Sequence, residues 1–111
     1  MEKFIFLYRG GMDRTLPPEA MQAQMQKWIT WMDSLQKKGI LGGSEPLQPT
    51  GKLVSGKDKV VTDGPFIEAK EIVGGYTIVT AENIDEAVEI SKGCPIFESN
   101  GMLEIRPLTK M

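Results

Sequence analysis

The residues of this chain that could do chemistry gather in one segment, Thr62 to Tyr76. Its sharpest feature is the turn Asp63-Gly64-Pro65-Phe66, because an Asp side chain can bond backbone amides two residues on and Gly permits positive φ. One interpretation is a rigid turn or bulge that interrupts a pair of strands. The other is that the turn presents the Asp63 carboxylate to a cleft with Phe66 as one wall, where a carboxylate of raised pKa serves as a general base.

Charged residues follow this turn closely, at Glu68, Lys70 and Glu71. On an extended segment Glu68 and Lys70 share one side, whereas Glu71 points the other way. A charge cluster on a hairpin is usually a solvated face. The alternative is that Lys70 binds an anionic group or lowers the pKa of a carboxylate.

The sequence contains no histidine and one cysteine, Cys94. The absence of histidine excludes Ser-His-Asp and Cys-His catalysis and removes the side chain that titrates near neutrality. We therefore predict no metal site and no cofactor, since Gly10-Gly11 and Thr50-Gly51-Lys52 also match no nucleotide-binding fingerprint. Cys94 has no basic neighbour in the sequence, and we expect it to be buried and unreactive.

Size and charge narrow the class of protein further. The 111 residues provide room for one domain. A formal net charge of −2 argues against general nucleic-acid binding, which needs many cations. A single cysteine fits a reducing compartment, and the apolar run Phe4–Tyr8 is too short for a signal peptide or a membrane span. We expect a cytoplasmic protein that contacts neither nucleic acid nor membrane.

Hydrophobic patterns predict the elements that position these residues. Residues 4–8 are apolar on both alternating faces, which is typical of a central strand. Residues 17–38 form a helix with one apolar stripe, made of Met21, Met25, Trp28, Met32 and Leu35. Residues 41–59 are rich in Gly and Pro, so short extended pieces such as 52–54 are expected there and no long regular element. Residues 60–62 and 75–80 are the next two strands.

A second helix is predicted to begin after Asn83, which is a good N-cap with Glu86 in capping-box register. It ends at Gly93, and residues 102–106 follow as an edge strand. The order β-α-β-β-α-β predicts an α+β fold of the ferredoxin-like type, an antiparallel sheet with two helices on one face. One side of the apolar strand 4–8 then faces away from the helices. Because monomers rarely expose such a patch, we predict a homodimer whose sheets pack face to face.

The segment 61–76, Val-Thr-Asp-Gly-Pro-Phe-Ile-Glu-Ala-Lys-Glu and then Gly-Gly-Tyr, resembles the signature of the DGPF, or YCII-related, family. The likeness extends to residues 93–95 and 102–108 and covers nearly the whole chain, so we predict one YCII-related domain over residues 1–111. It implies a dimeric α/β-barrel whose cleft contains an Asp and, in many relatives, a His. It also implies an association of many members with sigma factors. Where relatives place that His, this chain has residues 97–101, which contain none.

Two hypotheses of function follow. The first is a small-molecule enzyme, such as an isomerase, lyase or cofactor-free oxygenase, with Asp63 as the acid/base. The second is a non-catalytic ligand-binding or regulatory module that serves transcription through a protein partner. The predicted ligand-binding residues are Tyr8, Arg9, Phe66, Lys70, Tyr76 and Arg106. The resemblance carries Gly64, Pro65 and Glu68 over as parts of the motif.

Overall fold

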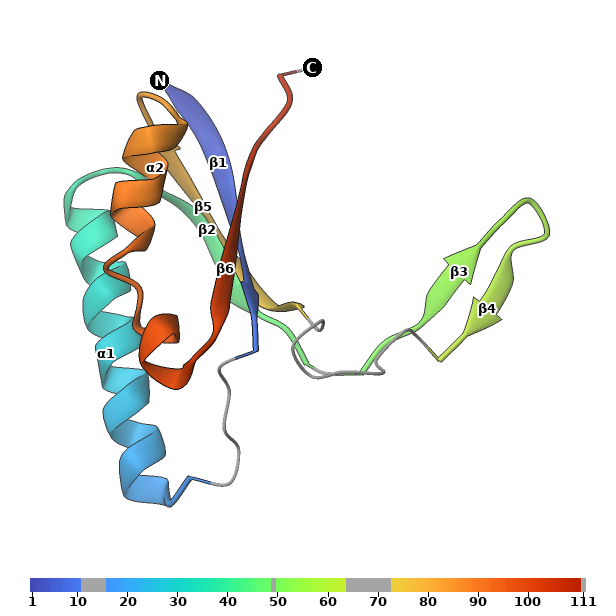
Figure 1. Ribbon diagram of the computed structural model, residues 1–111, viewed down its shortest axis with the longest axis horizontal. Helices are drawn as coiled ribbons and strands as arrows, with labels where there is room; N and C mark the ends of the chain where they lie inside the picture. The colour runs from blue at the N-terminus through green and yellow to red at the C-terminus, as the bar shows by residue number, and fades with distance from the viewer. Residues whose placement is uncertain (11–15, 49, 64–72, 111) are drawn as a thin grey trace.

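The computed structural model describes residues 1–10, 16–48, 50–63 and 73–110. Four antiparallel strands form the main sheet, in the order β2-β5-β1-β6 (Figure 1). Their bounds are β1 Glu2–Arg9, β2 Leu41–Pro46, β5 Val73–Ala81 and β6 Met102–Pro107. The helices are α1 Pro18–Lys37, α2 Ile84–Ser91 and the short 3-10 helix η2 Pro95–Ser99, and a second sheet pairs β3 Leu53–Ser55 with β4 Val60–Thr62.

Strand β1 lies at the centre of the main sheet, between β5 and β6, as its apolar sequence predicted. Alternation sends Phe4, Phe6 and Tyr8 to the side that the helices cover, and all three are buried. From β5, Thr77 and Val79 join them, both fully buried. The prediction that β6 is an edge strand is also confirmed.

The second strand of the sheet is β2, and the prediction that residues 60–62 supply it is wrong. β2 contains Gly42 and Gly43. Glycine has a low propensity for strands, and the sequence analysis therefore predicted an irregular segment here. The structure gives Gly42 another role: a Cβ there would lie 3.0 Å from both Cγ2 and the carbonyl oxygen of Ile78 on β5. β2 therefore pairs closely with β5 because this residue has no side chain.

Residues 60–62 instead form β4, which pairs with β3 in a separate hairpin, here called the arm (residues 53–62). Gly56 adopts φ +76° at its tip and Lys59 φ 55°, and the Lys59 amide donates to the Gly56 carbonyl at 3.2 Å. Figure 1 shows the arm projecting away from the main sheet on the side opposite the helices.

Helix α1 packs on the sheet only through its second half. Trp31 and Leu35 are buried, and Trp28 and Met32 pack against the core. The first half extends past the end of the sheet (Figure 1), so the members of the predicted stripe at positions 21 and 25 are exposed. The predicted apolar stripe therefore packs on the core from Trp28 onward, whereas its earlier members do not.

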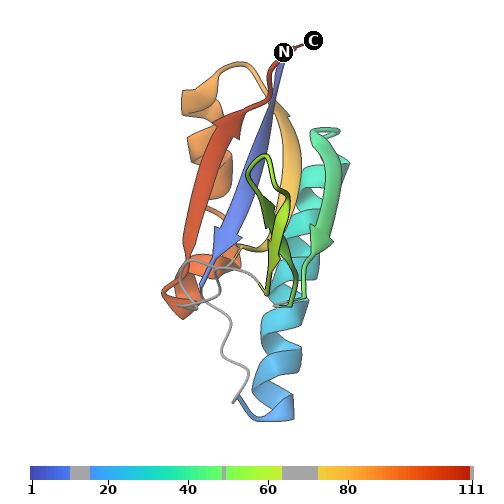
Figure 2. The ribbon, with the colours of Figure 1, turned by 90° about the vertical axis from the view of Figure 1, so that its right-hand side faces the viewer.

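Helix α2 begins as predicted. The Asn83 side chain accepts a hydrogen bond from the Glu86 amide at 2.9 Å, while the Glu86 carboxylate accepts from the Glu82 amide at 3.2 Å. Both helices cover one face of the sheet, which confirms the α+β ferredoxin-like fold (Figure 1). Figure 2 looks onto the other face, here called the open face, with the arm in front of it.

Candidate functional site

The open face carries an apolar centre with charged groups around it. Strand β1 places Ile5, Leu7 and Arg9 there, on the side opposite its buried residues. In the strand register, Ile5 lies beside Ile78 of β5. Ile5, Leu7 and Ile78 make up the apolar centre, and each is only partly buried in the single chain. Polar residues in register with this strand on the same face include Tyr76, Glu104 and Arg106.

Two arginines flank one carboxylate on this face. Arg9 donates to Oε1 of Glu104 from Nη2 at 3.0 Å and from Nε at 3.2 Å. Nε of Arg106 lies 4.0 Å from Oε2 of the same carboxylate. The Arg106 side chain remains 69% exposed. Such a cluster can bind an anionic oxygen of a ligand, because guanidinium groups match carboxylate-like geometry.

A second polar pair lies across β5, where the Tyr76 hydroxyl donates to Oε2 of Glu45 at 3.3 Å. Glu45 belongs to β2 and is directly opposite Tyr76 in the register. The structure thus brings together three of the predicted ligand-binding residues, Arg9, Tyr76 and Arg106, on one face of the sheet.

Asp63, the predicted acid/base, follows β4 at the base of the arm. Its carboxylate forms an ion pair with the Lys52 ammonium, which precedes β3. The Asp63 side chain is 87% exposed, so the described residues form no cleft around it. The remaining predicted motif and site residues lie outside the described part of the structure: Gly64, Pro65, Phe66, Glu68 and Lys70.

Tyr8 lies on the opposite face from the other predicted ligand-binding residues. Its hydroxyl donates to Oγ1 of Thr77 at 2.5 Å, and Oγ1 of Thr77 lies 2.8 Å from Oγ of Ser44. The ring also makes an edge contact with Trp28, with centroids 4.9 Å apart. Burial raises the pKa of Tyr8 well above its usual range, against the smaller lowering effect of the Thr77 hydroxyl. Tyr8 therefore belongs to the core beneath the sheet.

The expected burial of Cys94 is confirmed. Its side chain is inside the core, and burial raises the pKa of the Cys94 thiol to about 12, against the lowering effect of a backbone hydrogen bond at Ile96. A thiol that stays protonated is a poor nucleophile. Among the described residues, no three His, Cys, Asp or Glu side chains are placed to hold a metal ion. In the same part of the chain, no helix has the length and apolar character to cross a membrane.

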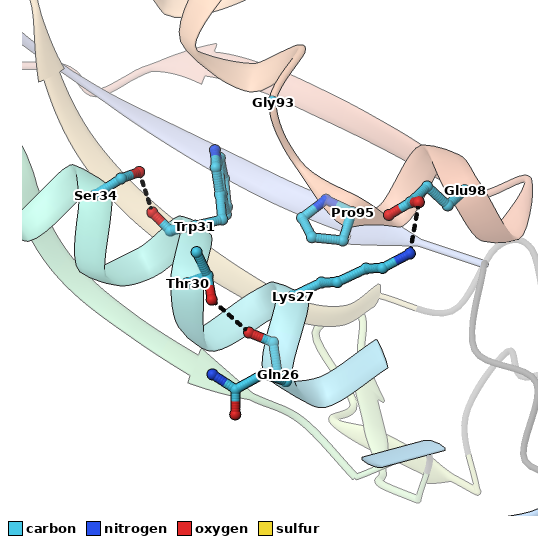
Figure 3. Close-up of a pocket in the computed structure, with 8 residues that line it drawn as sticks. All are labelled: Gln26, Lys27, Thr30, Trp31, Ser34, Gly93, Pro95 and Glu98. Atoms are coloured by element: carbon cyan, nitrogen blue, oxygen red, sulfur yellow. Dashed lines mark hydrogen bonds and ion pairs between the residues drawn. The ribbon is translucent and has the colours of Figure 1, made fainter. Parts of the chain in front are cut away.

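A hollow of about 420 Å³ lies on the helical side, between α1 and the segment that joins α2 to η2 (Figure 3). Its polar side chains are largely used within the protein. Lys27 forms an ion pair with Glu98 at 2.9 Å across the hollow, and Thr30 and Ser34 donate to backbone carbonyls of α1. Because it lies on the other side of the sheet from the arginine cluster, this hollow is separate from the candidate site.

Sequence reasoning missed Glu104, Glu45 and Lys52. The sequence did contain a signal for Glu104. It lies two residues before the predicted ligand-binding residue Arg106, and residues two apart on a strand share a face. Glu45 was hidden by the assignment of its segment as irregular. Lys52 meets Asp63 only through the pairing of β3 with β4, which no local pattern specified.

Comparisons with known proteins agree with this architecture. A family model described as the YCII-related domain matches residues 4–111. Uncharacterized protein R00369 of Rhizobium meliloti (strain 1021) is 30% identical in an alignment of 88 residues, with 69% of this chain and 69% of that protein covered. The 5-chloro-2-hydroxyhydroquinone dehydrochlorinase TftG of Burkholderia phenoliruptrix AC1100, solved in complex with 2,5-dihydroxybenzoquinone, superposes with a TM-score of 0.50. That likeness covers 98% of this chain and 94% of the other at 14% identity, and it shows a shared fold.

Proposed function

This chain belongs to the YCII-related family, and we propose that it is a small-molecule enzyme whose cleft forms over the open face of the sheet in a homodimer. One observation carries the proposal: charged and phenolic groups surround an apolar centre on a sheet face that no described helix or strand covers. Ligand sites are mostly apolar with a few convergent polar groups, and this face has that composition.

The cluster of Arg9, Glu104 and Arg106 favours a ligand with an anionic oxygen, and the apolar centre favours a flat or ring-shaped body beside it. The fold neighbour supports the same ligand class, because it is a dehydrochlorinase solved with 2,5-dihydroxybenzoquinone. We therefore place oxygen-substituted rings first among candidate substrates.

In this proposal Asp63 is the acid/base of the reaction. A carboxylate transfers protons most effectively when it is positioned against the substrate and withdrawn from bulk water. Asp63 is exposed in the single chain, and in this proposal a second copy of the chain against the base of the arm withdraws it from water. The homodimer is thus part of the proposed active site.

Binding of 2,5-dihydroxybenzoquinone, followed by calorimetric titration, tests the ligand class. We expect Arg106→Gln to weaken binding about tenfold, the effect of losing one charge-assisted hydrogen bond of roughly 1.4 kcal/mol. Lys27→Gln is the matched control, since that cation lies on the helical side, and it should bind as the unmodified protein does. Equal affinity of the Arg106→Gln variant and the unmodified protein would remove the arginine cluster from the site.

The exposure of Asp63 favours a second candidate, a ligand-binding or regulatory module without catalysis. The family resemblance suggests the transcription machinery as the partner of such a module. The variant Asp63→Asn separates the two functions. An enzyme should lose turnover of a ring substrate by a hundredfold or more, since general acid–base catalysis contributes roughly 10²–10⁴-fold, while binding persists. A module should bind the ligand and a protein partner equally well with either residue.

A further inference from the structure

Of the described elements, the arm packs least on the rest of the protein. β3 and β4 pair only with each other, and every residue of the two strands is exposed. The exposed fraction of its apolar side chains ranges from 44% at Leu53 to 59% at Val54 and Val61. An isolated two-stranded hairpin is marginally stable in water at best. A hairpin with apolar side chains on both of its faces needs a surface to pack against.

The whole chain exposes more surface than a monomer should. A folded monomer of 12.3 kDa is expected to expose about 6,100 Å², whereas this chain exposes 8099 Å². Its radius of gyration is 15.6 Å, compared with about 13 Å for a compact chain of this length. The excess of about 2,000 Å² falls within the roughly 1,000–2,500 Å² that each chain of an obligate homodimer buries.

The open face and the arm border the same space. Figure 1 shows the arm leaving the end of the sheet and running outward from the open face, so that the two meet at an angle. Figure 2, viewed from the open side, places the arm in front of the sheet. The arm does not fold back onto the sheet of its own chain. A body that covers the open face would also lie against the arm.

We propose that the arm and the open face form one binding surface, here called the seat. A second copy of the chain occupies the seat, and the arm of each chain packs against its partner. The inference builds on the homodimer of the proposed function and adds the element that secures it. A two-fold dimer satisfies both chains at once, because each arm finds a partner body and each open face is covered. The same contact brings the partner against Asp63 at the base of the arm.

Sedimentation velocity on purified protein between 0.5 and 100 µM tests the seat. We expect the unmodified protein to be a dimer and the double variant Val54→Lys, Val61→Lys to raise the dimer dissociation constant at least tenfold, because cations at a buried contact are costly. Ile29→Lys is the matched control, an exposed apolar residue on α1 away from the seat, and it should leave the constant within twofold. An arm variant that dimerises as tightly as the unmodified protein would overturn the proposal.

A photoreactive phenylalanine analogue at Val61 gives a second measure that does not depend on the strength of the dimer. Irradiation should yield a covalent product of twice the chain mass, and the same analogue at Ile29 should yield none. A product of single-chain mass only, with the cross-link inside one chain, would show that the arm packs on its own body and would contradict the proposal.

Leu7→Lys on the open face distinguishes this inference from the proposed dimer itself. If Leu7→Lys dissociates the dimer and the arm variant does not, the face-to-face dimer stands and the role of the arm is wrong. If the unmodified protein sediments as a monomer at 100 µM, both fail. Ligand binding is measured separately, so a failed titration with 2,5-dihydroxybenzoquinone leaves the result for the arm intact.

Discussion

At the scale of single residues, the hydroxyl groups buried under the sheet belong to the core, whereas the polar groups on the open face form the candidate site. The buried Tyr8 hydroxyl donates to the buried Thr77 hydroxyl, which also contacts the hydroxyl of the exposed Ser44, so each of the two buried oxygens has a partner. Buried polar groups without partners are costly, and this chain avoids that cost. The groups that face solvent are on the other side of the sheet, where Arg9 and Tyr76 hold their carboxylate partners.

Cys94 allows a test of the core at this scale. Burial raises the pKa of its thiol from about 9 to about 12, so the folded state holds the proton more tightly than the unfolded state does. The stability that this provides is complete below pH 9 and is lost as the pH rises towards 12. Urea unfolding at pH 8, 9.5 and 10.5 should show a falling midpoint, and the fall should be shallower in the Cys94→Ala variant. Identical slopes in both proteins would contradict the burial of this thiol.

At the scale of elements, the pairing of β2 with β5 depends on residues that lack side chains. Gly42 lies against Ile78, and a Cβ at Gly75 would come within 3.0 Å of the Glu45 carbonyl oxygen. The two glycines allow an edge strand of weak propensity to lie against β5. The pairing in turn brings Glu45 next to Tyr76, which creates one of the polar pairs of the open face.

Two adjacent glycines provide a matched pair of variants. Gly42→Ala should destabilise the protein by about 1–3 kcal/mol, because its new methyl group meets backbone and branched side-chain atoms that cannot move aside freely. Gly43→Ala meets no atom within 4 Å and should be neutral or slightly stabilising, since alanine restricts the unfolded chain. Chemical denaturation measures both. Equal effects of the two substitutions would show that β2 is not held against β5 as described.

At the scale of the whole molecule, the shape is broad and thin, with extents of 45 × 44 × 18 Å. One layer of helices covers one face of the sheet, and the arm stands out on the other side (Figure 1). The arm alone exposes four apolar side chains, at Leu53, Val54, Val60 and Val61.

This distribution predicts a stability that depends on protein concentration. For a dimer that unfolds to single chains, a hundredfold increase in concentration adds about 2.7 kcal/mol to the free energy of unfolding. Thermal unfolding at 1 and 100 µM should therefore differ by several degrees. A variant with Val54→Lys and Val61→Lys should show a smaller difference at these concentrations. A midpoint independent of concentration in the unmodified protein would be the behaviour of a monomer.

The sequence by itself determined the central strand, the second helix with its cap, the edge strand β6 and the family, because each rests on local patterns of apolar spacing, capping or motif. Only the tertiary structure decided which segment pairs with β5. Close approach at Gly42 and Gly75 selects β2, and no local pattern reports a close approach between distant residues. The tertiary structure also decided which predicted site residues share a face of the sheet. Tyr8 and Arg9 are neighbours in the chain, yet the pleat of a strand sends them to opposite sides of the sheet, one into the core and one to the candidate site.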